Sequence, residues 1–187
     1  MEATSALGRT CQVTGLHVDR SAERLILVNA VTAVLWLATG GVMALLIALT
    51  RWPAVHLITN PEWFYRLVSA HGAAMLIFWI LFFEVAGLIF GCSVLLDRPL
   101  LAPRVGWLAY GLMLFGSLAA ALVVLGGGAT VMFTAYPPLE ATHWFYLFVL
   151  VFAVGALVAV IHFLANIAHA RIVGGMRSLP LFTFGLV

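Results

Sequence analysis

Four long apolar stretches dominate the pattern of the chain, and polar or helix-breaking residues bound each of them. An α-helix rises about 1.5 Å per residue, so about 20 apolar residues cross the roughly 30 Å hydrocarbon core of a bilayer. The stretches that reach this length are residues 25–49, 67–96, 105–125 and 143–167. We therefore predict an all-α fold, a polytopic transmembrane helix bundle with four spanning helices.

The two ends of the chain lie outside these four helices. Residues 1–24 carry charged side chains and have no apolar core of their own, which excludes a cleavable signal peptide. We predict that they form a cytoplasmic N-terminal tail and that residues 25–187 form one membrane domain. The last apolar run, residues 179–187, is too short to span and predicts the start of a fifth helix.

The composition agrees with the bilayer as the solvent for most of the chain. Of the 187 residues, 64% are hydrophobic and 9% are charged, whereas an ordinary soluble domain is about half apolar and about a quarter charged. A soluble fold of this size has too small an interior for that much apolar surface. The net charge of +2 is too small and too scattered to indicate binding to nucleic acid.

Arginine carries the topology signal, because the sequence contains no lysine. Seven arginines fall on one predicted side of the membrane and two on the other. The seven are Arg9, Arg20, Arg24, Arg98, Arg104, Arg171 and Arg177, and the two are Arg51 and Arg66. Since basic residues accumulate on the cytoplasmic side, we predict that both termini are cytoplasmic.

His71 is the most informative polar residue of the second predicted helix. It lies about one and a half turns inside the outer end of that helix, where an imidazole needs a partner. Two interpretations stay open: a hydrogen bond to a neighbouring helix, or axial ligation of a metal with the other ring nitrogen held by a carbonyl or hydroxyl group. Glu84, about 20 Å deeper, is either protonated and hydrogen-bonded or part of a proton path.

The other histidines and the cysteines give weaker signals. His162 is near the inner end of the fourth predicted helix, at the wrong depth to share a metal with His71. His143 begins that helix on the outer side, so it is either a second haem ligand opposite His71 or an interfacial side chain in an aromatic belt. Cys11 and Cys92 have neither disulfide nor metal-site spacing, and we assign them no function.

Three short segments share the predicted outer side of the membrane. They are Ala70-His71-Gly72, Tyr136-Pro137-Pro138-Leu139 and His143-Trp144-Phe145-Tyr146-Leu147. Their order, spacing, membrane side and helix number together resemble subunit I of the haem-copper terminal oxidases, and the B-type branch most closely. The resemblance covers about residues 20–187.

The resemblance implies that His71 is one of two axial ligands of a low-spin haem, which relays electrons to a high-spin haem and copper pair. It also implies that the loop carrying Tyr136 binds the cofactor by lying over the haem propionates. Phe133 departs from the family, since many members have a hydrogen-bonding Trp or Tyr there. The second low-spin ligand and all ligands of the high-spin haem and copper are expected from later helices or a second polypeptide, so we expect no activity from this chain alone.

The resemblance further implies a function and a set of partners. The chain is expected to be the N-terminal part of the catalytic subunit of a cytochrome c oxidase-type enzyme, which reduces dioxygen and translocates protons. Its expected partners are the remaining helices, a copper-bearing subunit II, the lipid bilayer of a bacterial or archaeal cell, and cytochrome c or a small copper protein as electron donor. The alternatives are a haem-free accessory or scaffold subunit, a bis-histidine cytochrome b and a nitric oxide reductase-like protein.

Overall fold

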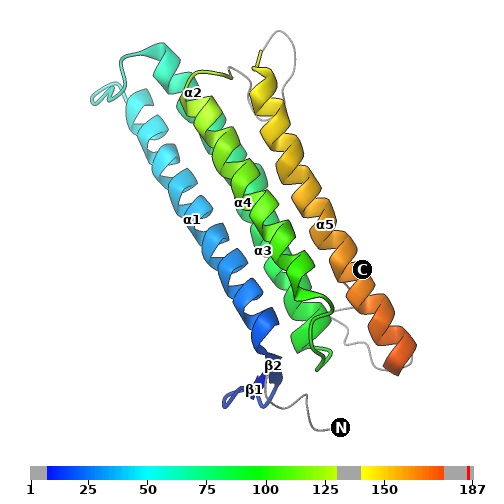
Figure 1. Cartoon of the computed structure of the whole chain (residues 1–187). Helices are drawn as coiled ribbons and strands as arrows, with labels where there is room; N and C mark the ends of the chain where they lie inside the picture. The colour runs from blue at the N-terminus through cyan, green and yellow to red at the C-terminus, as the bar shows by residue number, and fades with distance from the viewer. Residues whose placement is uncertain (1–7, 130–139, 175–184, 186–187) are drawn as a thin grey trace. The chain divides into compact units, whose positions relative to one another are not determined.

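The computed structural model of the chain describes residues 8–129, 140–174 and 185, and these residues are almost entirely helical. Four helical segments are long and apolar enough to cross a membrane (Figure 1). They are Arg20–Arg51, Pro61–Val94, Pro103–Leu125 and His143–Ile172. This confirms the predicted all-α fold with four spanning helices. The predicted start of a fifth helix, residues 179–187, lies outside the described residues apart from Gly185.

The second spanning segment is a continuous run of α- and π-helical pieces. In chain order these are α2 (Pro61–Ala73), the π-helix η1 (Ala74–Phe78), α3 (Trp79–Ile89) and the π-helix η2 (Phe90–Val94). The side-chain oxygen of Asn60 caps α2 by accepting hydrogen bonds from the N–H of Glu62 at 2.8 Å and of Trp63 at 3.4 Å. The helix therefore begins at Pro61 rather than at residue 67, because this cap extends it beyond the apolar run.

The first helix, α1 (Arg20–Arg51), also begins before its apolar run at residues 25–49. Asp19 stands directly before it, and the Asp19 carboxylate accepts a hydrogen bond from the N–H of Ala22 at 3.1 Å. This is the usual arrangement of an N-terminal cap. The first polar turn of α1 is thus part of the helix although it does not contribute to the hydrophobic signal.

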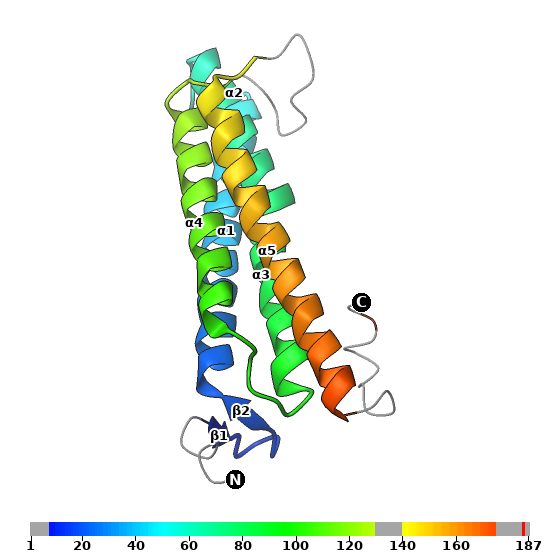
Figure 2. The same ribbon diagram turned by 45° about the vertical axis from the view of Figure 1, so that its right-hand side comes forward.

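A short antiparallel hairpin precedes α1 (Figure 2). Its strands are β1 (Gly8–Thr10) and β2 (His17–Asp19), with Arg9 opposite Val18. The guanidinium group of Arg9 forms an ion pair with the carboxylate of Glu23 in α1. The segment predicted as a polar tail therefore contains ordered structure that is tied to the first helix.

The third and fourth spanning segments are α4 (Pro103–Leu125) and α5 (His143–Gly174). The apolar pattern placed these helices at residues 105–125 and 143–167. The fourth helix continues past its apolar run to Gly174, and its last turn contains Arg171.

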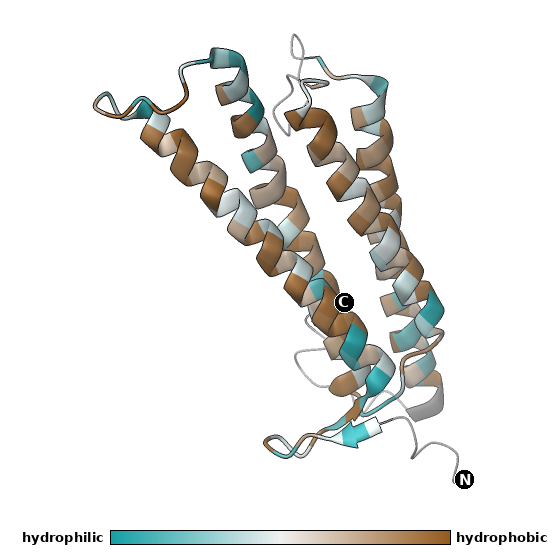
Figure 3. Ribbon diagram, turned by 60° about the vertical axis from the view of Figure 1, so that its left-hand side comes forward, coloured by the Kyte–Doolittle hydropathy of each residue, from teal (hydrophilic) through white to brown (hydrophobic). Residues whose placement is uncertain are grey.

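Much of the apolar surface of the four segments is not covered by protein. Only 22% to 39% of the residues in their apolar windows are buried, and Figure 3 shows hydrophobic residues along most of the length of the helices. Large side chains such as Leu35, Leu122 and Leu150 are exposed. A helix that is apolar all round is typical of a membrane span, and the chain is a multi-pass membrane protein.

The chain forms two compact units. One comprises Met1–Ala30, Phe83–Gly111 and Gly155–Val187, and the other comprises Val31–Phe82 and Leu112–Val154. The second unit contains His71. Its core includes an aromatic cluster in which the ring centroids of Phe78 and Phe152 are 5.1 Å apart.

Gly116 marks a close contact between α4 and α5 within this second unit. A Cβ atom at this position would lie 2.5 Å from the backbone nitrogen of Phe152 and 2.7 Å from the backbone oxygen of Phe148. Glycine therefore allows the two backbones to touch, as small residues commonly do between membrane helices.

Candidate functional site

His71 lies in α2 and is held by the middle of α1. Its ring atom Nδ1 is 2.9 Å from the backbone oxygen of Gly40. Because a carbonyl oxygen only accepts hydrogen bonds, Nδ1 carries the proton, and Nε2 keeps its lone pair in the neutral ring. Nε2 has no hydrogen-bond partner among the described residues, and the side chain is half-buried. The imidazole thus has one fixed nitrogen and one nitrogen available as a ligand.

Gly40 is buried where α1 meets the second spanning segment. A Cβ atom at Gly40 would lie 2.5 Å from Sδ of Met75 and 3.4 Å from Cβ of Ala74. The absence of a side chain at Gly40 leaves room for the Met75 side chain, and the Gly40 carbonyl lies within hydrogen-bond reach of His71. The partner of His71 is therefore a fixed main-chain dipole rather than a mobile side chain.

The helix widens directly after His71. The N–H of Ala74 hydrogen-bonds to the carbonyls of both Ala70 and His71, and the π-helical turn η1 begins at that residue. Short π-helical insertions in α-helices are frequent at functional sites. No proline marks this point in the sequence, and for that reason the pattern of residues did not predict it.

The geometry at His71 fits an axial haem ligand. A metal-ligating histidine usually donates its other ring N–H to a carbonyl or carboxylate group, which fixes the ring orientation and raises its basicity. His71 meets this requirement through Gly40. In the described part of the chain, no three His, Cys, Asp or Glu side chains gather into a metal-binding group.

The other candidate residues from the sequence either lie away from the contact between His71 and Gly40 or fall outside the described residues. Tyr136 and Phe133 are outside the described residues. His143 is exposed at the first position of α5, and its ring centroid lies 4.9 Å from that of Trp144. This contact favours the interfacial interpretation of His143. Glu84 is exposed on α3 and has no hydrogen-bond partner among the described residues.

His162 belongs to a different set of contacts, in the first compact unit. Its Nε2 donates a hydrogen bond to the backbone oxygen of Leu101, and Asn166 accepts one from the backbone N–H of Leu101 at 2.7 Å. His162 and Asn166 are 6% and 5% exposed. Both side chains therefore serve to hold the turn before α4, and Asn166 is a structural residue that the sequence analysis did not identify.

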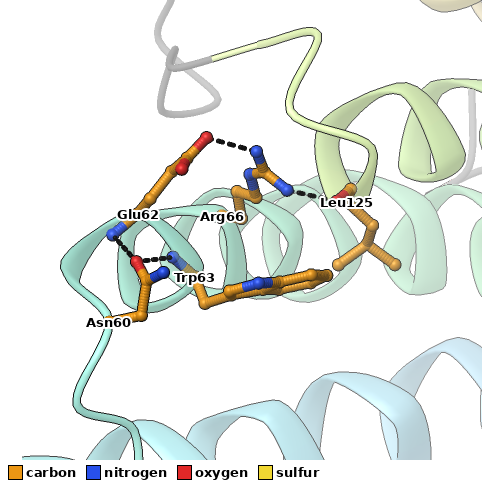
Figure 4. Close-up of polar contacts among 5 residues, drawn as sticks. All are labelled: Asn60, Glu62, Trp63, Arg66 and Leu125. Carbon is orange, nitrogen blue, oxygen red and sulfur yellow. Dashed lines mark hydrogen bonds and ion pairs between the residues drawn. The ribbon is translucent and has the colours of Figure 1, made fainter.

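Arg66 joins α2 to the end of α4 (Figure 4). Its guanidinium group pairs with the carboxylate of Glu62 and also donates a hydrogen bond to the backbone oxygen of Leu125 at 3.3 Å. It lies 5.0 Å from the ring centroid of Trp63, and only 19% of the side chain is exposed. The contact with Leu125 joins residues 59 positions apart, so Arg66 fixes one end of the helix that carries His71.

Replacing Arg66 by leucine is expected to lower the free energy of unfolding by about 1.5–3 kcal/mol, the range for hydrogen bonds to charged groups. The stability of Arg66→Lys should fall between that of the unchanged protein and that of the leucine variant, since lysine keeps the charge near Glu62 but lacks the planar fork of arginine. Denaturant unfolding in detergent measures both. Arg104→Leu is the matched control, because Arg104 is exposed and has no ion pair among the described residues. Equal losses from both leucine variants would show that the Arg66 contacts do not stabilise the fold.

Comparison with known proteins gives one family. Residues 24–187 match the family model described as Cytochrome C and Quinol oxidase polypeptide I. No curated protein matches the chain. The family match covers most of the chain, including all four spanning segments apart from the first residues of α1. The chain therefore belongs to the haem-copper oxidase subunit I family, a family of membrane-bound oxidase-type oxidoreductases that generally bind haem and copper.

Proposed function

We propose that this chain supplies His71 as one axial ligand of the low-spin haem in a B-type oxidase that reduces dioxygen. The observation that carries the proposal is the hydrogen bond from Nδ1 of His71 to the Gly40 carbonyl, which leaves Nε2 available. When bound, the haem supplies one-electron transfer. The residues of the chain hold the imidazole in one tautomer and one orientation, and they stabilise positive charge on the ring through the Gly40 carbonyl.

The same proposal covers the rest of the oxidase. The second low-spin ligand, the high-spin haem and copper are assigned to later helices or a second polypeptide. The proposed partners are a copper-bearing subunit II and, as electron donor, cytochrome c or a small copper protein. Tyr136 is proposed to contact the haem propionates. The arginine distribution supports cytoplasmic termini, in a bacterial or archaeal cell membrane.

The membrane complex that contains this chain is expected to show a low-spin haem in its reduced-minus-oxidised visible spectrum. It should also contain a high-spin haem and copper, and it should consume oxygen when supplied with a reduced electron donor. The purified chain by itself should bind no stoichiometric copper. A complex without haem would support the scaffold alternative, and a complex that consumes nitric oxide but not oxygen would support the reductase alternative.

A further inference from the structure

A cleft of about 380 Å³ opens between the end of α1 and the start of α2, within the second compact unit. Its lining includes Arg51, His56, Thr59, Pro61, Phe64 and Tyr65. The volume lies near the lower end of the range of about 300–1,000 Å³ for small-molecule sites. It suits a small polar group rather than a whole lipid or a large cofactor.

The cleft carries positive charge without a balancing acid. No aspartate or glutamate is among its lining residues. The side chain of Arg51 is exposed and has no ion pair or hydrogen bond among the described residues. The acid nearest in sequence, Glu62, pairs with Arg66. The cleft therefore attracts an anion.

His56 adds a second polar group that its backbone holds in place. Its φ angle is +41°, which is uncommon for a residue other than glycine, and such backbone strain often occurs at ligand sites. Nδ1 of His56 donates a hydrogen bond to the backbone oxygen of Thr50 at 3.1 Å. The ring is thereby fixed at the wall of the cleft.

The position of the cleft indicates the source of the anion. Arg51 is the last residue of α1, and Trp52, which follows it, is 56% exposed. Tryptophan and arginine at the end of an apolar helix are typical of the membrane–water interface, the level at which lipid headgroups lie. The exposed Tyr65 and the half-buried Phe64 give the cleft an aromatic wall at the same level.

We propose that this cleft binds the phosphate group of an anionic membrane lipid. The Arg51 guanidinium forms charge-assisted hydrogen bonds to the phosphate oxygens, and the Thr59 hydroxyl donates a further hydrogen bond. The lipid chains then lie against the exposed apolar surface of the adjoining helices. This proposal does not depend on haem binding at His71.

The test uses the assembled complex in detergent and three probes: a short-chain phosphatidylglycerol, a diacylglycerol with the same chains, and inorganic phosphate. Native mass spectrometry counts bound lipid, and titration calorimetry measures affinity. Phosphatidylglycerol should bind most tightly, and Arg51→Gln should weaken it about tenfold or more, as expected for a hydrogen bond to a charged group. Thr59→Val should weaken it less, and Arg104→Gln should have no effect.

Three outcomes would overturn the proposal. Unchanged phosphatidylglycerol binding in Arg51→Gln would show that Arg51 does not bind the phosphate group. Equal binding of the diacylglycerol would show an apolar site that does not recognise phosphate. Inorganic phosphate that binds as tightly as phosphatidylglycerol would assign the cleft to a free anion rather than to a lipid.

Discussion

His71→Ala is expected to abolish the low-spin haem spectrum of the assembled oxidase and its oxygen consumption together. A haem held by two axial histidines needs both nitrogen donors, so losing one leaves a five-coordinate or lost haem rather than a slightly shifted band. In the role proposed for His71, electrons would then have no relay to the oxygen-reducing site. Visible and magnetic circular dichroism spectra of the purified complex measure the first effect, and an oxygen electrode measures the second.

His143→Ala is the matched control, since His143 lies in the same compact unit and its ring packs on Trp144. This variant should keep the low-spin signal and most of the turnover. If it removed the haem signal while His71→Ala did not, the ligand assignment would be wrong. The bis-histidine cytochrome alternative would then gain support.

Gly116→Ala is expected to destabilise the protein by several kcal/mol or to prevent its folding. The added Cβ atom would meet the backbone of Phe148 and Phe152 at less than 3 Å, and backbone atoms in a packed helix cannot rotate aside as a side chain does. Overpacking a core costs about 1–3 kcal/mol when side chains absorb it. The recovery of folded protein and the midpoint of unfolding in detergent give the measurement.

Gly111→Ala, in the same helix, is the matched control and should not destabilise the protein. Nothing lies within 4 Å of the added Cβ atom at Gly111, so the change should be neutral or should stabilise α4 by up to about 1 kcal/mol, the helix-propensity difference between the two residues. A similar loss of stability in both variants would mean that the contact at Gly116 is not what makes glycine necessary there.

The four spans could be predicted because hydrophobic length is a property of consecutive residues. The ends of the helices could not be predicted from that property. Asn60 and Asp19 cap helices whose first turns are polar. A polar turn does not belong to an apolar run, so the length of the run does not include it. Cap residues followed by a helix-compatible turn were present in the sequence, and they were the signal that could have placed both starts.

The candidate site was predictable only in part. The depth of His71 in its helix is local information, and it indicates that the imidazole needs a partner. The position of the partner along the chain is not local information. Gly40 and Gly41 are adjacent glycines, yet a Cβ atom added at Gly40 would contact Met75, whereas one added at Gly41 would have nothing within 4 Å. Only the packed structure distinguishes them.

Backbone partners explain the other omissions. Arg66 and His162 donate to the main-chain oxygens of Leu125 and Leu101. Every residue has such an oxygen, so the identity of the partner leaves no trace in the sequence. Side-chain patterns therefore predict which polar residues need a contact, and they do not predict where the contact lies.

The contacts of Leu101 with α5 also determine which changes the turn before α4 can accept during evolution. His162 and Asn166 bind the carbonyl and the N–H of this residue, while its side chain is 40% exposed. Substitutions at position 101 can thus keep both hydrogen bonds, because both use the main chain. Proline is the exception, since it lacks the N–H. An insertion or deletion would be a different matter, since it would move the peptide group itself away from α5.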